Sequence, residues 1–203
     1  SQIRIKQLHR KLENELYMTE KMAAHAASSK LMKYPQDNIQ QATQDLLLME
    51  FHDILPGSAI QPVENYSISL AGHGLEELSR VKTQAFLSLC SGQKVANDGE
   101  IPLLVYNPHP YEIPYIVECE FQLADQNKNK KIFANRVVYQ NGRKLPCQVE
   151  KEASNFNVDW RKKSVFYAKL KPGQINRFDA RIEMIDSKPV PVIRQTKDKF
   201  IFK

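Results

Sequence analysis

The spacing of apolar residues divides the chain into two parts near residue 90. Before that point, apolar residues recur every three or four positions, which is the period of an amphipathic helix. After it come short runs rich in β-branched and aromatic residues, without a helical period. We therefore expect an α+β protein, with an antiparallel three-helix bundle over residues 1–92 and a partial antiparallel β-sandwich over residues 93–203.

Three helices are predicted in the first part. The first should end at the Tyr34-Pro35 step, because a residue before proline is driven out of the helical region. The second should cover about residues 37–53, and the Pro56-Gly57 pair that follows should stop it. The third should begin at Ser58, which has the spacing of a capping box to Gln61.

Each predicted helix carries one apolar stripe, and the second helix, with the widest stripe, should be the most buried. Gly72 and Gly74 should weaken the middle of the third helix. The stripes are, in order, Ile5, Leu8, Leu12, Leu16 and Ala23; Ile39, Ala42, Leu46 and Met49, widened by Leu47, Leu48 and Phe51; and Ile60, Val63, Leu75, Leu78, Val81, Ala85 and Leu89.

About seven short strands are predicted in the second part. Asn141-Gly142 has the composition of a tight hairpin turn, and Lys171-Pro172-Gly173 predicts another turn. The expected strands are Ile101–Tyr106, Tyr115–Leu123, Ile132–Tyr139, Leu145–Glu150, Ser164–Leu170, Ile175–Ile185 and Val190–Ile193.

Composition narrows the functional classes. The net charge of +6 is spread over short clusters, so we expect no nucleic-acid partner. No apolar run approaches the roughly 20 residues that span a bilayer, so no membrane partner is expected either. The three cysteines form no C-x-x-C pair, which favours a reducing, cytoplasmic location. Because the chain starts at Ser1 and helical periodicity begins at once, we expect a piece of a longer protein.

Candidate chemistry lies at the end of the second predicted helix, where His52 precedes Asp53 and a Pro-Gly break. A neutral imidazole is the commonest protein metal ligand, and an adjacent carboxylate can orient a ligand or a sugar hydroxyl. Two plainer readings remain open. His52 could complement the negative end of the helix dipole, and Asp53 could bond local backbone groups. A metal needs three or four protein ligands, and the dipeptide supplies too few.

Residues 46–58, ending in Phe-His-Asp-Ile-Leu-Pro-Gly-Ser, resemble the signature of family 38 glycoside hydrolases, the α-mannosidases, in their cytosolic, vacuolar and bacterial branch. Residues 1–13 are similar to the family's junction between the catalytic barrel and the middle three-helix domain. Residues 103–111 resemble the start of its C-terminal β-domain. Glu50 stands where the family often has an amide, at a position that is not a ligand. Mannosylglycerate-type members depart from the Leu-Pro-Gly-Ser wording.

The resemblance implies a role for two residues. His52 matches the family's last ligand to a zinc or cobalt ion, and Asp53 matches the aspartate that contacts bound mannose. The other ligands, from an H-x-D motif and the nucleophilic aspartate, belong in the family to an N-terminal barrel, as does the acid/base carboxylate. No H-x-D occurs in this sequence, so no catalytic residue is expected in this chain. The partners so implied are that missing catalytic domain and a mannose-containing glycan.

The sequence thus predicts a fragment of a retaining, metal-dependent α-mannosidase that is inactive alone and binds metal only weakly. A homo-oligomer is possible if a helical face that docks on the barrel is left bare. The alternative is a non-enzymatic helical and β-sandwich module that binds glycans or another partner. In that case Trp160 and Tyr167 would be the candidate sugar platforms, although both are equally suited to a core.

Overall fold

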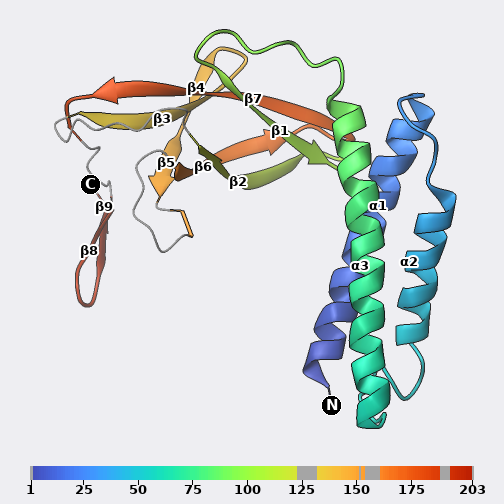
Figure 1. Ribbon diagram of the computed structural model, residues 1–203. Helices are drawn as coiled ribbons and strands as arrows, with labels where there is room; N and C mark the ends of the chain where they lie inside the picture. The colour runs from blue at the N-terminus through green and yellow to red at the C-terminus, as the bar shows by residue number, and fades with distance from the viewer. Residues whose placement is uncertain (1, 123–131, 151, 154–160, 188–192, 203) are drawn as a thin grey trace. The chain divides into compact units, whose positions relative to one another are not determined.

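The computed structural model describes residues 2–122, 132–150, 152–153, 161–187 and 193–202. It has three helices followed by antiparallel sheets, so the predicted α+β class is confirmed (Figure 1). The chain forms two compact units. The first contains residues 1–94, 108–110 and 173–175, and the second contains residues 95–107, 111–172 and 176–203. Among the described residues, no helix is both long and apolar enough to cross a membrane.

Three helices make up most of the first unit, and consecutive helices run in opposite directions (Figure 1). They are α1 (Ile3–Ser28), α2 (Gln36–Met49) and α3 (Gln61–Cys90). The longest of them, α3, packs against both α1 and α2. Two prolines occupy helix starts, where a missing N–H costs little: Pro35 precedes α2, and Pro62 lies in the first turn of α3.

The predicted stripes of α1 and α3 largely form the core of this unit. In α1, Ile5, Leu12 and Ala23 are buried. In α3 the buried stripe residues are Leu78, Val81, Ala85 and Leu89. Ile60 is the exception, since it is exposed just ahead of α3.

The prediction for α2 is wrong in two respects, the end of the helix and the extent of its burial. The helix ends at Met49, so residues 50–53 lie in turns rather than in a final helical turn. It is also not buried all round, because it meets its neighbours along one row only. That row, Ile39, Ala42, Leu46 and Met49, is buried, whereas the side chains that were expected to widen it, Leu47, Leu48 and Phe51, are exposed.

The predicted capping box is also wrong. Helix α3 begins at Gln61, three residues later than expected, and its N-cap residue Ile60 makes no side-chain cap bond. The Ser58 hydroxyl is turned back toward Asp53 instead. Ser58 therefore closes the preceding turn rather than opening the helix.

Gly74 allows a close approach between helices. A Cβ at this position would lie 3.0 Å from Leu12 Cδ1 and 3.3 Å from Asp45 Oδ2. At Gly72 a Cβ would meet nothing within 4 Å. The two glycines thus differ, since Gly72 only lowers helix propensity while Gly74 makes room for the neighbouring side chains.

The second unit is built from two sheets and a separate hairpin. One sheet has the strand order β1-β7-β3-β4 and the other β2-β6-β5. The pairs β2–β6, β5–β6, β3–β4 and β3–β7 are antiparallel, as is the β8–β9 hairpin. The strands are β1 (Ile101–Asn107), β2 (Ile113–Gln122), β3 (Phe133–Gln140), β4 (Arg143–Leu145), β5 (Cys147–Glu150), β6 (Arg161–Leu170), β7 (Gln174–Ile185), β8 (Ile193–Gln195) and β9 (Phe200–Phe202).

Both main sheets supply one core. Phe166 of β6 meets Phe178 of β7 edge-on, with ring centroids 5.0 Å apart, and both side chains are buried. The same cluster takes Val117 from β2 and Val138 from β3. Alternate residues of β6 and β7 belong to this cluster, namely Phe166, Ala168 and Leu170 and then Phe178 and Ala180, as expected for strands that face a core on one side.

The turn predictions hold, while some strand boundaries differ. Asn141 and Gly142 both have positive φ, 50° and 78°, and join β3 to β4 as a tight hairpin. Pro146 divides the strand expected over 145–150 into β4 and β5, because proline has no N–H for the ladder. The strand expected at 190–193 falls mostly outside the described residues, and β9 was not predicted.

Candidate functional site

The segment Glu50–Ala59, called here the His52 turn, follows α2 directly. Its backbone forms a series of tight turns, in which Ile54 N–H and Leu55 N–H both donate to the carbonyl of Phe51. Gly57 has a φ of +84°, a left-handed conformation that disfavours other residues. The sequence produces this shape because Pro56 and Gly57 end any helical continuation.

His52 is presented outward on this turn. Its side chain is 77% exposed, and that of Asp53 is 54% exposed. The His52 Nε2 atom lies 3.4 Å from Asp53 Oδ2, and the Phe51 ring lies beside the imidazole at 4.3 Å between centroids. The imidazole is thus close to its neighbours in sequence and open to solvent.

Asp53 organises the turn. Its Oδ1 atom accepts a hydrogen bond from the Ser58 hydroxyl at 3.1 Å. Its carbonyl oxygen accepts the backbone N–H groups of Ser58 and Ala59. The local bonding that sequence reasoning left open for Asp53 is therefore present, and Oδ2 is the oxygen that remains directed at His52.

Helix α1 supports the turn at both of its ends. At the first end, His9 Nε2 lies 3.0 Å from Glu50 Oε1. At the second, a Cβ on Gly57 would lie 2.3 Å from the backbone nitrogen of Gln2, so only glycine fits there. Between them Ile54 is buried, with 5% of its surface exposed.

Exposed apolar side chains flank the turn on its neighbouring segments. Leu47 and Leu48 lie at the end of α2, Phe51 lies in the turn itself, and Ile60 lies between the turn and α3. Ile3 begins α1 and is 69% exposed. Exposed apolar side chains gathered around one polar residue are typical of a surface that another protein part covers.

A second histidine–aspartate pair lies between α2 and α3 and was missed by sequence reasoning. His73 Nδ1 lies 2.7 Å from Asp45 Oδ2, and Gln41 Nε2 donates to Asp45 Oδ1 at 3.2 Å. Asp45 is 3% exposed. The signal available was an aspartate adjoining the apolar row of α2, a position that needs a polar partner when it is buried.

The Asp45 carboxylate raises the pKa of His73 above its ordinary 6.5, through the hydrogen bond first and the opposite charge second. Burial of the ring opposes this rise, while the carboxylates of Glu77 and Glu76 add to it. Glu77 is itself engaged, because it accepts a hydrogen bond from Asn38 and pairs with Arg80. This pair is therefore part of the packing between α2 and α3.

The donor set for a metal is incomplete within the part of the chain that the structure describes. No three histidine, cysteine, aspartate or glutamate side chains there lie together in a way that could hold an ion. His52 is accessible enough to serve as one ligand, and Asp53 is its nearest carboxylate. The described residues therefore fit a contributor to a metal site whose other ligands come from elsewhere.

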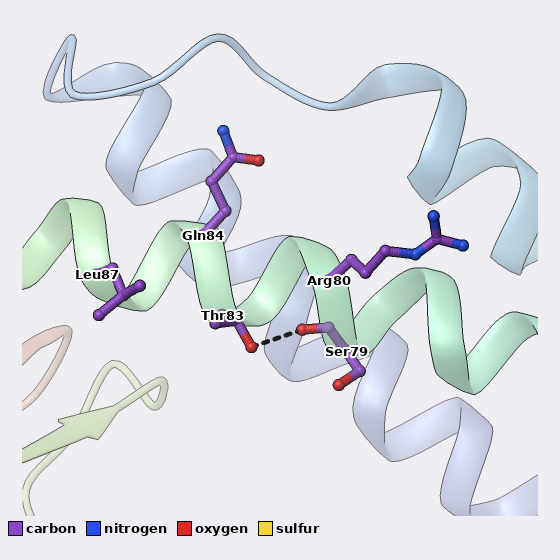
Figure 2. A pocket seen from close by; sticks show the side chains of 5 residues that line it. All are labelled: Ser79, Arg80, Thr83, Gln84 and Leu87. Carbon is purple, nitrogen blue, oxygen red and sulfur yellow. Dashed lines mark hydrogen bonds between the residues drawn. The ribbon is translucent and has the colours of Figure 1, made fainter.

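A surface hollow of about 460 Å³ lies along α3, lined by Ser79, Arg80, Thr83, Gln84 and Leu87 (Figure 2). Two of its polar side chains already have local partners. The Thr83 hydroxyl donates to the Ser79 carbonyl, and Arg80 pairs with Glu77. The lining residues belong to the C-terminal half of α3, whereas the His52 turn leads into the N-terminal end of that helix. We assign no chemistry to this hollow.

The helical unit can now be compared with known families. Residues 1–89 match the family model described as alpha mannosidase middle domain. These 89 of the chain's 203 residues are similar to that middle domain. The predicted recognition is thus confirmed for this part of the chain, and the matched segment contains the whole His52 turn.

The match to the middle domain ends at residue 89, so the likeness of residues 103–111 to the family's β-domain stays a prediction. No curated protein matches the chain. For the glycan-binding alternative, Trp160 lies outside the described residues. Tyr167 projects from β6 with about half of its surface exposed.

Proposed function

We propose that this chain is part of a retaining, metal-dependent α-mannosidase of glycoside hydrolase family 38, which hydrolyses terminal α-linked mannose. The chain supplies one metal ligand, His52, and structural support to an N-terminal catalytic domain that lies outside it. The nucleophile and the acid/base carboxylate belong to that domain. Retaining glycosidases need two such carboxyl groups about 5–5.5 Å apart. On its own, this chain is therefore inactive.

The observation that carries this proposal is the outward position of His52 on a turn of an alpha mannosidase middle domain. His73, in the same unit, is held by a 2.7 Å contact to a buried carboxylate, whereas the carboxylate nearest His52 is exposed and lies 3.4 Å away. His52 instead offers its ring to solvent and contacts only Phe51 and Asp53 among the interactions recorded for it.

His52 suits zinc or cobalt, since an imidazole binds both ions. When bound, such an ion acts as a template and Lewis acid for neighbouring sugar hydroxyls. What this chain does is hold one imidazole in place. A single ligand binds weakly, so we expect the isolated chain to need the catalytic domain before it takes up metal.

Asp53 is proposed to contact the mannose. An ionised carboxylate is an acceptor with two oxygens, and sugar hydroxyls are donors. In the structure Oδ1 is engaged by Ser58, while Oδ2 faces the outward side with His52. The same residue can thus organise the turn through one oxygen and bind substrate through the other.

The catalytic domain is the partner that we propose for the surface around His52. Leu47, Leu48 and Phe51 are exposed apolar side chains within five residues of His52 in the sequence, which favours burial of this surface against another protein part. In an isolated chain the same surface could bring two copies together as a homo-oligomer. We propose a cytoplasmic location, which agrees with three cysteines that are all free thiols. We propose neither a nucleic-acid nor a membrane partner.

The test is His52→Ala in the intact protein that carries this chain. The enzyme is stripped of metal, reloaded with zinc or cobalt and assayed on a chromogenic α-mannoside. We expect at least about a 100-fold loss of activity and a weaker metal affinity, because the metal loses one of the side chains that coordinate it directly. His25→Ala is the control. It changes a histidine of the same helix that lies about 24 Å along α1 from His9, the residue that contacts the His52 turn. Activity equal to wild type in reloaded His52→Ala would refute the proposal.

The reading frame upstream of Ser1 separates this proposal from a free-standing binding module. An enzyme requires several hundred preceding residues that include an H-x-D motif. A gene that starts near Ser1 would favour the module instead.

A further inference from the structure

Residues at the start of α1 contact the His52 turn near both of its ends. At the start of the turn, His9 Nε2 lies 3.0 Å from Glu50 Oε1. The side chain of His9 is 12% exposed and that of Glu50 is 44% exposed, so the contact lies at the surface and the imidazole is its more sheltered partner.

The other end of the turn is fixed by the backbone. Gly57 lies so close to Gln2 that a Cβ would come within 2.3 Å of its backbone nitrogen. The buried side chains of Ile5 and Ile54 belong to these two segments. Gln2, which precedes α1, and the first residues of α1 therefore contact both ends of the turn.

Within the turn, backbone hydrogen bonds connect the two supported ends to the residues beside His52. Backbone hydrogen bonds link Phe51 to Ile54 and Leu55, and link Asp53 to Ser58 and Ala59. His52 lies inside this bonded network but is itself 77% exposed. Its position is thus determined by the turn rather than by packing around its own ring.

We infer that His9 is a positioning residue for His52, acting through Glu50. This inference rests on the proposed role of His52 as a metal ligand and adds a residue of α1 to that site. Without His9, Glu50 is free to move into solvent and the start of the turn loosens. The imidazole then samples several positions, and metal binding must select the correct one.

Cobalt binding to the intact protein tests this inference directly. The metal-free protein is titrated with Co²⁺, and the visible absorption of the bound ion reports both affinity and coordination geometry. We expect His9→Ala to raise the Kd for cobalt about tenfold, the lower end of the effect of residues that support metal ligands. The absorption at saturating cobalt should return to the wild-type shape, since the ligands are unchanged.

A conservative variant separates positioning from other roles of His9. The side-chain amide of His9→Gln can still donate to Glu50 but is a poor metal ligand. It should restore the Kd to within about threefold of wild type. The matched control is Arg10→Ala, which removes an exposed ion pair with Glu13 on the same helix. It should leave the Kd unchanged.

The possible results are distinct. A wild-type Kd in His9→Ala, or an equal rise in Arg10→Ala, would overturn the positioning role. If His9→Gln is as weak as His9→Ala, the hydrogen bond to Glu50 is not the cause and the inference fails. In the same titration, unchanged cobalt binding by His52→Ala would remove the proposed function. Loss in His52→Ala without any change in His9→Ala would remove only the inference.

Discussion

The helical unit contains two histidine–aspartate pairs that differ in surroundings rather than in chemistry. His73 and Asp45 lie between α2 and α3 with the carboxylate buried. His52 and Asp53 are neighbours on an exposed turn, with 3.4 Å between their nearest atoms. His73, whose side chain is 49% exposed, is joined to the buried Asp45 carboxylate by a hydrogen bond of 2.7 Å, and Gln41 donates to the second carboxylate oxygen. The exposed pair leaves its imidazole accessible.

The difference lies in the burial of the carboxylate, which commits Asp45 to the packing of the helices and leaves Asp53 accessible. A buried carboxylate needs partners or it destabilises the fold, so Asp45 and His73 are committed to each other. An exposed imidazole has no such requirement and is available to a ligand. Adjacent residues are conspicuous in a sequence, whereas a pair 28 positions apart is visible only after the helices are placed together.

Replacing the aspartate of each pair tests most directly whether the two pairs contribute differently to stability. Asp45→Ala deletes a buried group and two hydrogen bonds, and we expect it to lower the free energy of unfolding by about 2 kcal/mol. Asp53→Ala removes an exposed group with one side-chain bond and should cost less than about 1 kcal/mol. Urea denaturation of the two variants measures both. Equal losses would show that the pairs do not differ in this way.

The glycines on either side of His73 test the packing around Asp45 through a smaller expected change in stability. Gly72→Ala meets open space, so it should stabilise α3 by up to about 1 kcal/mol through helix propensity. Gly74→Ala brings the same propensity gain, but its Cβ approaches Leu12 Cδ1 at 3.0 Å and Asp45 Oδ2 at 3.3 Å. The melting temperature should therefore rise for Gly72→Ala and not for Gly74→Ala. A rise of similar size in both would contradict the close approach.

The smallest expected effect is a pH dependence of stability that comes from His73 and Asp45. The pKa of His73 is raised in the folded protein, chiefly by its hydrogen bond to Asp45. Its contribution to stability is thus complete below the unfolded value of 6.5 and declines as the pH rises through the folded pKa. Glu77 and Glu76 face the same ring and act in the same direction.

Denaturation of wild type and His73→Gln at pH 6 and pH 9 measures this contribution. The stability difference between the two proteins should be larger at pH 6. Asp45→Asn is the control, because it removes the negative charge that favours protonated His73. In proteins that carry Asp45→Asn, the loss of stability caused by His73→Gln should change little with pH. A difference that grows toward pH 9 would reverse the sign argued here.

Much of the fold followed from the order of residues along the chain. Three-to-four-residue periodicity located all three helices, and Asn141-Gly142 located a hairpin. Errors arose where a residue type fits two local structures. Ser58 has the correct spacing for a helix cap, but the carboxylate of Asp53 competes for its hydroxyl. Leu47 and Leu48 resemble core residues because the sequence does not show which surface a neighbour covers.

The candidate site was predictable only in part. The His-Asp-Ile-Leu-Pro-Gly-Ser wording identified His52 and Asp53 through a resemblance that the middle-domain match supports. The support from α1 was not visible, since His9 and Glu50 are 41 positions apart and no periodicity connects them. Glu50 was set aside because it is not a ligand, and the structure gives it a bond to α1 instead.

The contact between Gln2 and Gly57 has a practical consequence for anyone who produces this protein. Because the backbone nitrogen of Gln2 lies against Gly57, a tag fused directly ahead of residue 1, in a protein limited to residues 1–203, would begin beside the His52 turn. A polyhistidine tag there would add several imidazoles near the residue whose metal affinity is to be measured. Purification handles should therefore be attached at the carboxyl end, or be cleaved away before titration.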